Sequence, residues 1–204
     1  MNCPICGKPR NLWASLFGKP AHPECERLRA EEERKKRDEA QMQEAEAKRK
    51  VLQITLQHFE RGEFISLNDQ AKMLLDPGEI CCVMVTGALR ADFYRELVGL
   101  RAGTLRAGLT GKPRVDGLTP KDAGTLHVTT HRVCFLGASG AKSIPLRKVI
   151  QCEVEGDVLH VSVEGRVSAS YFIIENRQAL QVTAAAIRKL ASMAKSKQSP
   201  TIMD

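Results

Sequence analysis

The sequence predicts an α+β protein with a small N-terminal zinc module, a long charged helix and a curled antiparallel β-sheet, an open barrel, capped by a C-terminal helix. Three observations carry this prediction. Cysteine and histidine pairs occupy the first 25 residues, a run without glycine or proline follows to residue 61, and short β-branched runs separated by turns fill most of the remainder. The expected boundaries are 1–27 for the zinc module, 28–62 for the helical connector, 63–78 for a linker, 79–195 for the β domain with its helix and 196–204 for a flexible tail.

Composition and charge limit the classes of function that the chain can serve. Of its 204 residues 43% are hydrophobic and 4% are aromatic, and the formal net charge is +7. The hydrophobic fraction is that of a globular protein with a buried core, whereas the low aromatic content argues against a surface that stacks single-stranded bases. The positive balance permits anionic partners such as nucleic acid or lipid headgroups without requiring them.

The apolar residues and the cysteines indicate a cellular compartment. No stretch approaches the roughly 18 uninterrupted apolar residues of a membrane-spanning helix, and the N-terminus lacks the apolar segment of a secretory signal. The cysteine count is seven, which is odd. Four cysteines lie in apolar runs, where thiols behave as small buried hydrophobic groups: Cys81, Cys82, Cys134 and Cys152. We therefore expect a reducing, cytoplasmic location, with peripheral contact to a membrane left open.

The first 25 residues contain two pairs of metal-ligand residues. Cys3 and Cys6 are separated by two residues, as are His22 and Cys25, and 15 residues lie between the pairs. Thiolate and imidazole are the ligands that tetrahedral Zn²⁺ prefers, and a two-residue gap lets one tight turn present both donors. Because four protein ligands fill the coordination shell, the spacing predicts one structural Zn²⁺ rather than a catalytic ion. The alternative is a chance grouping in a disordered N-terminus.

Two aromatic residues lie between the ligand pairs. Trp13 and Phe17 are one helical turn apart, so they pack together against the zinc or form a docking surface for a partner. The motifs CPICG and HPEC resemble those of treble-clef and zinc-ribbon modules. This resemblance covers residues 3–25 and implies no specific partner.

The connector is rich in alanine, glutamate, lysine, arginine and glutamine, all strong helix formers. Its first half lacks an apolar stripe and therefore predicts a solvated, charge-paired helix that ends at Gly62. Its second half, within 42–59, carries apolar residues at a spacing of three and four, interrupted by Arg49: Met42, Ala45, Leu52, Leu56 and Phe59. This stripe forms a short self-associating coiled coil or docks on the following domain, and the short repeat favours docking.

From residue 79 onward, short β-branched and aromatic runs alternate with turn residues, a pattern typical of antiparallel strands. Along Val158–Val163, Leu159 and Val161 alternate with His160 and Ser162, so we expect one dry face and one wetter face. The last long element begins at Asn176, a good N-cap, and carries an apolar face. A meander of strands closed by one amphipathic helix predicts a small open barrel.

Within the β domain, a family resemblance follows from a hairpin signature and the strand after it. The hairpin residues are Gly124, Thr125, Leu126, Thr129, Arg132, Phe135 and Gly137, and the following strand and turn contribute Ile144, Pro145, Leu146 and Val149. The pattern is similar to that of bacterial GRAM and pleckstrin-homology-like domains, over roughly residues 79–195. The resemblance implies a fold and a binding habit, not a reaction. We expect Phe135 and Leu146 to fill the barrel, Gly137 to permit the turn and Arg132 to pair across strands.

The sequence predicts a binding protein rather than an enzyme. His127, His131 and His160 lie among strand residues without a convincing acid partner, and no phosphate-binding glycine loop with a terminal lysine occurs. We therefore expect a non-catalytic adaptor whose β domain binds a protein partner. Nucleic acid is an alternative partner for the zinc module and basic helix. Anionic lipid is another, through a segment whose basic residues have no intervening acid: Arg101, Arg106, Lys112 and Arg114.

Overall fold

The computed structural model describes residue 8 and residues 23–71, 73–93, 118–166 and 168–203. The chain divides into two units, Met1–Val51 and Leu52–Asp204, and each is described by itself. None of the helices in these ranges combines the length and the apolar character needed to cross a membrane.

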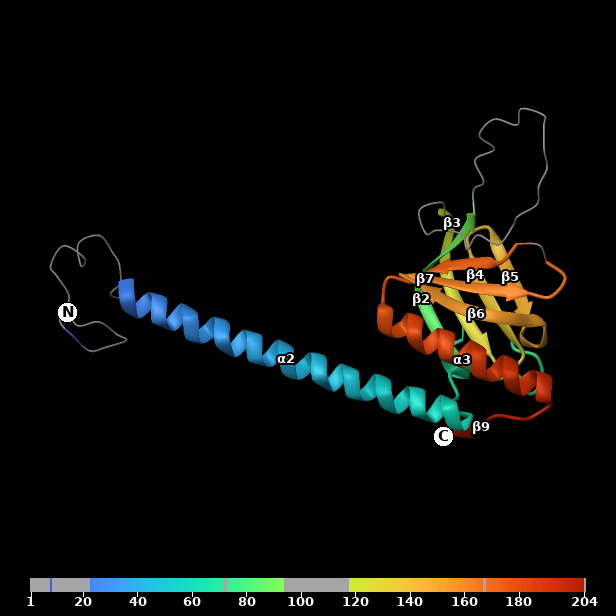
Figure 1. Cartoon of the computed structure of the whole chain (residues 1–204), viewed down its shortest axis with the longest axis horizontal. Coiled ribbons are helices and arrows are strands. Elements are labelled where there is room, and N and C mark those ends of the chain that lie inside the picture. Colours follow the sequence, from blue (N-terminus) through green and yellow to red (C-terminus); the bar gives the residue numbers. More distant parts are fainter. Residues whose placement is uncertain (1–7, 9–22, 72, 94–117, 167, 204) are drawn as a thin grey trace, which may run out of the picture. The chain divides into compact units, whose positions relative to one another are not determined.

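The predicted connector forms one helix, α2 (Pro23–Arg61) (Figure 1). Glu24 and Glu26 lie in its first turn and His58 and Arg61 in its last, which complements the helix dipole. Pairs of opposite charge at a spacing of four follow its exposed surface, as between Lys50 and Glu46 (2.8 Å). The helix ends where predicted, because Gly62 adopts a positive φ of 80°.

The apolar stripe of α2 has two different environments. Met42, in the first unit, is 74% exposed. In the second unit, Leu56 is half-buried and Phe59 is 6% exposed, and the Phe59 ring stacks on Phe64 with 4.7 Å between ring centroids. Docking on the β domain therefore accounts for the C-terminal end of the stripe.

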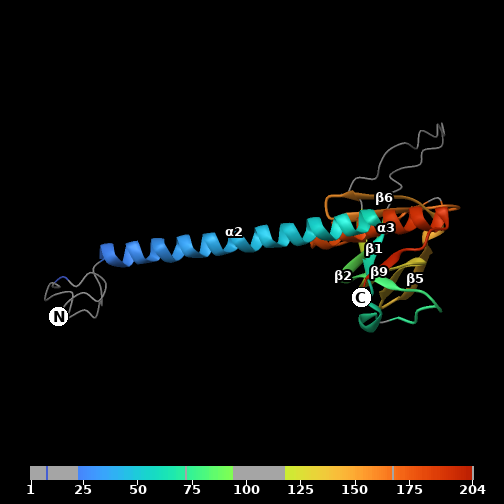
Figure 2. The same cartoon turned by 90° about the horizontal axis from the view of Figure 1, so that it is seen from below.

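Seven antiparallel strands form the sheet of the second unit, in the order β5-β4-β3-β2-β8-β7-β6. Their bounds are β2 (Cys81–Phe93), β3 (Leu118–Thr129), β4 (Arg132–Gly137), β5 (Gly140–Pro145), β6 (Val149–Glu155), β7 (Val158–Val163) and β8 (Ser170–Ile173). Figures 1 and 2 show the sheet curling around its core, with β5 and β6 as its two edges. This arrangement confirms the predicted α+β class and the open, antiparallel β domain.

The helix α3 (Arg177–Ser196) packs against β6, β2 and the short 3₁₀ helix η3 (Leu146–Lys148). It begins as predicted, since the Asn176 side chain accepts hydrogen bonds from the backbone N–H groups of Gln178 and Ala179. One face of α3 is buried: Leu180, Thr183, Ala184, Ala186, Ile187, Leu190, Ala191 and Met193. Phe135 and Leu146 fill the interior beneath it, as expected. The four cysteines predicted to be buried are buried.

The tail predicted to be flexible at 196–204 contains a strand instead. β9 (Thr201–Met203) pairs in parallel with β1 (Glu63–Ile65), within the segment 63–78 that was predicted to be a linker. The Thr201 N–H also donates to the Gly62 carbonyl (2.9 Å). The same linker contains a 3₁₀ turn, η1 (Asn68–Gln70). Both strands have three residues, too few for a hydrophobic period to reveal them.

Gly137 has a different role from the one predicted. The turn between β4 and β5 is formed by Ala138 and Ser139, and the positive φ there, 112°, belongs to Gly140. A Cβ atom on Gly137 would lie 2.2 Å from the Asp122 carboxylate. Glycine is therefore required at 137 for the close approach of Asp122 rather than for the turn itself.

Candidate functional site

Most of the residues predicted to form sites lie outside the described residues. This applies to Cys3, Cys6 and His22 of the predicted zinc site, to Trp13 and Phe17, and to the basic set Arg101, Arg106, Lys112 and Arg114. Cys25 is described: it lies in the first turn of α2 and is half-buried. The candidate sites that the structure describes lie in the second unit.

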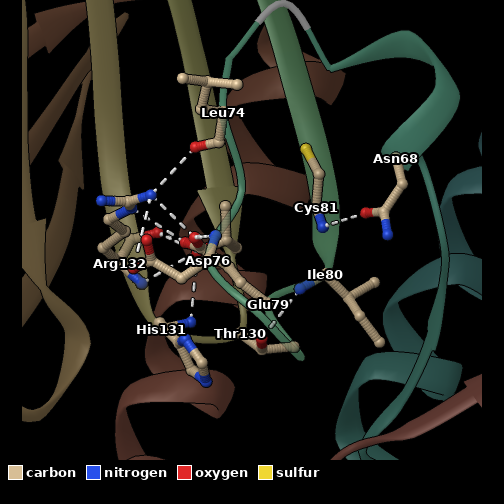
Figure 3. A network of polar contacts seen from close by, with 10 residues as sticks. Asn68, Leu74, Asp76, Glu79, Ile80, Cys81, Thr130, His131 and Arg132 are labelled. Atoms are coloured by element: carbon tan, nitrogen blue, oxygen red, sulfur yellow. Dashed lines mark hydrogen bonds and ion pairs between the residues drawn. The ribbon is translucent and has the colours of Figure 1, made fainter.

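A buried carboxylate organises one end of the sheet (Figure 3). The Glu79 side chain is completely buried and accepts two hydrogen bonds from Arg132, from Nε (2.9 Å) and Nη2 (2.8 Å). The Thr129 hydroxyl donates to the same carboxylate (2.5 Å), and the Asp76 backbone N–H donates to it as well (2.8 Å). Arg132 also donates to the Leu74 carbonyl (3.1 Å). The predicted cross-strand partner of Arg132 is therefore a residue just before β2.

The ionised state of Glu79 results from two opposing effects. Burial raises its pKa, but the hydrogen bonds from Asp76, Thr129 and Arg132 and the charge of Arg132 together lower the pKa below its ordinary value. The carboxylate is thus buried and charged. A buried charge of this kind is stable only with a paired cation, here Arg132, and with hydrogen bonds to its remaining lone pairs.

Asp76, Glu79 and His131 place one potential ligand atom each within 4.8 Å of one another, beside a cavity of about 680 Å³. Oxygen and imidazole ligands of this kind suit divalent cations. However, the Glu79 oxygens already accept four hydrogen bonds, two of them from Arg132. A metal ion would have to displace the guanidinium, so we interpret this cluster as a structural ion pair.

The turn between β4 and β5 binds a carboxylate of the chain itself. Asp122 accepts hydrogen bonds from the backbone N–H groups of Ala138 (3.0 Å) and Ser139 (3.1 Å) and from the Ser139 hydroxyl (2.6 Å). The bonds from Ser139 contribute most to lowering the Asp122 pKa below its ordinary value. Because Asp122 occupies these donors, the turn offers no vacant anion-binding nest.

His160 has neighbours that the sequence did not reveal. The strand register places Glu153 opposite His160, with 3.9 Å between Glu153 Oε2 and His160 Nδ1, and Ser162 Oγ lies 3.5 Å from His160 Nε2. The atoms stand in the order of a hydroxyl–imidazole–carboxylate relay, but 3.9 Å exceeds hydrogen-bond length. The Tyr171 ring also stacks on His160, at 5.1 Å between centroids. We interpret this group as the wetter face that the alternation predicted.

Two hollows adjoin along α3 and β6. The larger, about 780 Å³, is mostly apolar and lies among Leu56 and Phe59 of α2, Val154 of β6, and Ala184 and Ala185 of α3. The second, about 530 Å³, continues along β6 from Val149 to Glu153. Both are lined by Arg188 and Ser192, so we treat them as one α3–β6 groove.

Two of the cationic residues that line the groove donate to backbone carbonyl groups. Arg188 Nε donates to the Cys152 carbonyl (2.7 Å), and Lys189 Nζ donates to the Glu60 carbonyl (2.6 Å). Sequence reasoning assigned no function to Arg188 or Val154. The available signal was the run AAAIRKLAS, in which small residues lie on both sides of two adjacent bases and no acid occurs.

No family model matches the sequence, and no curated protein matches it. Among solved structures, the Vps36 N-terminal PH domain is similar, with a TM-score of 0.42 and 8% identity over 64% of this chain and 93% of that one. The C-terminal domain of an unknown protein from Leishmania infantum has a TM-score of 0.32 and 16% identity over 56% of this chain and 86% of that one. These values carry no information about a ligand or partner.

Replacing Arg132 by methionine should destabilise the second unit by about 3–5 kcal/mol, because it leaves the Glu79 carboxylate buried without its cation. Urea-induced unfolding followed by circular dichroism measures this loss. The matched control is Arg177→Met, which removes an exposed pair with Asp157 and should cost less than about 1 kcal/mol. Equal effects of the two changes would contradict the buried ion pair.

Glu79 should also make stability depend on acid. Its pKa in the folded state lies below its unfolded value, so its contribution is present above about pH 4.5 and is lost as the pH falls through the folded pKa. The free energy of unfolding of the wild type should therefore decrease more steeply between about pH 5 and pH 3 than that of Glu79→Gln. Parallel pH profiles would show that Glu79 is not the group responsible.

Proposed function

We propose that this chain is a non-catalytic cytoplasmic adaptor that binds an extended segment of a protein partner in the α3–β6 groove. The observation that carries the proposal is the unpaired edge of β6 beside a largely apolar hollow. Within the described part of the sheet, β6 pairs only with β7. An exposed strand edge is a template for another chain, and proteins usually cover or charge it.

The backbone groups of β6 that face the groove follow from the strand register. Glu155 pairs with Val158 across a two-residue turn, which makes this pair hydrogen-bonded. Hydrogen-bonded and non-hydrogen-bonded pairs alternate along an antiparallel ladder, so Val154 and Cys152 belong to non-hydrogen-bonded pairs. Their backbone N–H and C=O groups therefore point away from β7. The bond from Arg188 to the Cys152 carbonyl agrees with this direction. An added strand would use these groups, as in recognition by β-strand addition.

The apolar side chains of β6 and the bases of α3 favour a partner that is both apolar and acidic, while Glu60 and Glu153 also line the groove. Val154 is 37% exposed and Ile150 is 64% exposed, so both offer apolar contact. Helix α3 carries Arg177, Arg188, Lys189 and Lys195 and no acidic residue. Because Arg188 and Lys189 contact carbonyl oxygens, their charges remain available to carboxylates of a partner. The seven residues of β6 match a partner segment of about the same length.

Zinc is the second part of the proposal. Cys3, Cys6, His22 and Cys25 would hold one structural Zn²⁺, and the module that they fold would present Trp13 and Phe17 as a second contact surface. The cysteine and histidine spacing supports this part, as does the start of α2 at Pro23, which sets Cys25 in its first turn. Binding of anionic lipid through Arg101, Arg106, Lys112 and Arg114, and binding of nucleic acid, stay predictions from the sequence.

The groove can be tested with a peptide of sequence Glu-Val-Glu-Val-Glu-Val-Glu, titrated into the ¹⁵N-labelled full chain and followed by NMR. We expect amide shifts confined to β6 and the facing side of α3, with slower hydrogen exchange at the Cys152 and Val154 amides. Arg188→Glu should abolish these shifts, because it places an acid against the acidic peptide.

The matched control is Arg177→Glu, which reverses a charge on the same helix outside the lining of the groove. It should bind the acidic peptide as the wild type does. Equal losses in both variants would indicate attraction to the overall charge of α3, and shifts confined to other strands would place the binding surface elsewhere. Either result overturns the proposed groove.

Metal analysis of the purified chain tests the zinc site. We expect one zinc per chain, lost from the variant with Cys3→Ser and Cys6→Ser and retained in Cys152→Ser, whose thiol is buried in the core. Thermal unfolding of the β domain should be unchanged by the loss, because none of the four ligands belongs to the second unit. Zinc retained after the double substitution would refute this ligand set.

A further inference from the structure

A row of three side chains crosses β2, β3 and β4 on the face of the sheet opposite to the core. The strand register pairs Met84 with His127 and His127 with Cys134. Directly opposite residues of an antiparallel sheet point to the same face, with Cβ atoms about 4.5–5.5 Å apart. The alternate residues Val85, Leu126, Val128, Val133 and Phe135 belong to the core, so this row faces away from it.

His127 has an unusual environment for an imidazole. Its side chain is fully buried, and its two ring nitrogens are the only buried side-chain nitrogen or oxygen atoms of the described residues without a hydrogen-bond partner. Burial lowers the His127 pKa, and the nearby Thr125 backbone raises this pKa by a smaller amount. Because the net shift of this pKa is downward, the ring is neutral. A neutral imidazole has one nitrogen with a free lone pair, and that lone pair is unused here. A buried polar group of this kind requires a partner.

The neighbours of His127 determine which partner suits it. Cys134 is 4% exposed and offers a sulfur on one side, and half-exposed Met84 offers a thioether on the other. Thiolate and thioether are soft ligands that select Cu⁺ over Mg²⁺, Ca²⁺ and Mn²⁺, and imidazole also suits copper. We propose that Met84, His127 and Cys134 form a binding site for one Cu⁺ ion.

Binding of Cu⁺ at this site leaves the net charge of the site unchanged, because one proton leaves as one monovalent ion enters. Burial raises the pKa of the Cys134 thiol, so it is protonated before the metal arrives. Cu⁺ binding releases that proton and forms a Cu–S bond, and the thiolate neutralises the ion. The His127 nitrogen and the Met84 sulfur complete a three-ligand set. Ser143, opposite Cys134 on β5, is exposed and, with Met84, gives solvent access to the row.

The other cysteines of the second unit are less suited. The Cys81 thiol is directed to the Val83 carbonyl at 3.6 Å. Cys82 and Cys152 belong to the core on the opposite side of the sheet. Burial raises the pKa of both to about 12. Among the cysteines of the second unit, Cys134 is thus the one that the strand register places directly opposite His127.

The test uses the full chain with Cys3→Ser and Cys6→Ser, since these thiols would otherwise compete for copper. The protein is titrated anaerobically with Cu⁺ buffered by bathocuproine disulfonate, a chromogenic chelator. We expect one Cu⁺ per chain. Cys134→Ser and His127→Phe should weaken binding by about tenfold or more, because second-shell changes alone have effects of that size. Met84→Leu should weaken it, and Cys81→Ser should leave it unchanged.

X-ray absorption of the copper-loaded protein gives a second readout that needs no variant. The proposal predicts one nitrogen and two sulfur neighbours of copper. Sulfur neighbours alone, copper retained in Cys134→Ser, or no uptake against the chelator would each overturn it. Thermal unfolding of the metal-free variants checks their fold, and if His127→Phe fails to fold, Met84→Leu and the absorption spectrum decide the question.

Discussion

The packing of α3 into the open side of the curled sheet is the interaction on which the second unit depends. Since β5 and β6 do not pair with each other, the inner face of the sheet needs a cover. Leu180, Ile187 and Leu190 of α3 provide it, each at most 2% exposed. The neighbouring face of the same helix carries small and basic residues. Small side chains leave a hollow beside β6, so one helix both closes the core and forms the groove.

A second constraint acts at the far end of the sheet, where Glu79 joins the segment before β2 to β3 and β4. Arg132 and Thr129 donate to this carboxylate from positions 53 and 50 residues further along the sequence. Asn68 and Thr130 accept hydrogen bonds from the Cys81 and Ile80 backbone N–H groups. A buried charge with all its lone pairs occupied tolerates few alternative arrangements. We infer that this network fixes how residues 66–71 and 73–79 lie on the sheet.

Local chemistry explains which features could be predicted from the sequence. Asn176 caps α3 with its side chain and Gly62 ends α2 through its positive φ, so both act within a few residues of their own position. The alternation of Leu159 with His160 likewise sets the two faces of a strand within six residues. The strand pairing of Phe64 with Ile202 and the ion pair between Glu79 and Arg132 join residues far apart in the sequence. No local sequence pattern predicts such contacts. The groove was missed for another reason, because its signal is the absence of large side chains on α3. The predicted zinc and lipid residues lie almost entirely outside the described ranges.

The parallel pairing of β1 with β9 has a mechanical consequence. The chain enters β1 directly from α2, and β9 runs alongside in the same direction, with Glu63 beside Thr201 and Ile65 beside Met203. Tension applied between the start of β1 and the end of β9 would act along the two strands in opposite senses. All hydrogen bonds of the pair would then share the load at once rather than open one by one. The pair would therefore open in shear under a pull along the strands, with β9 attached alongside β1.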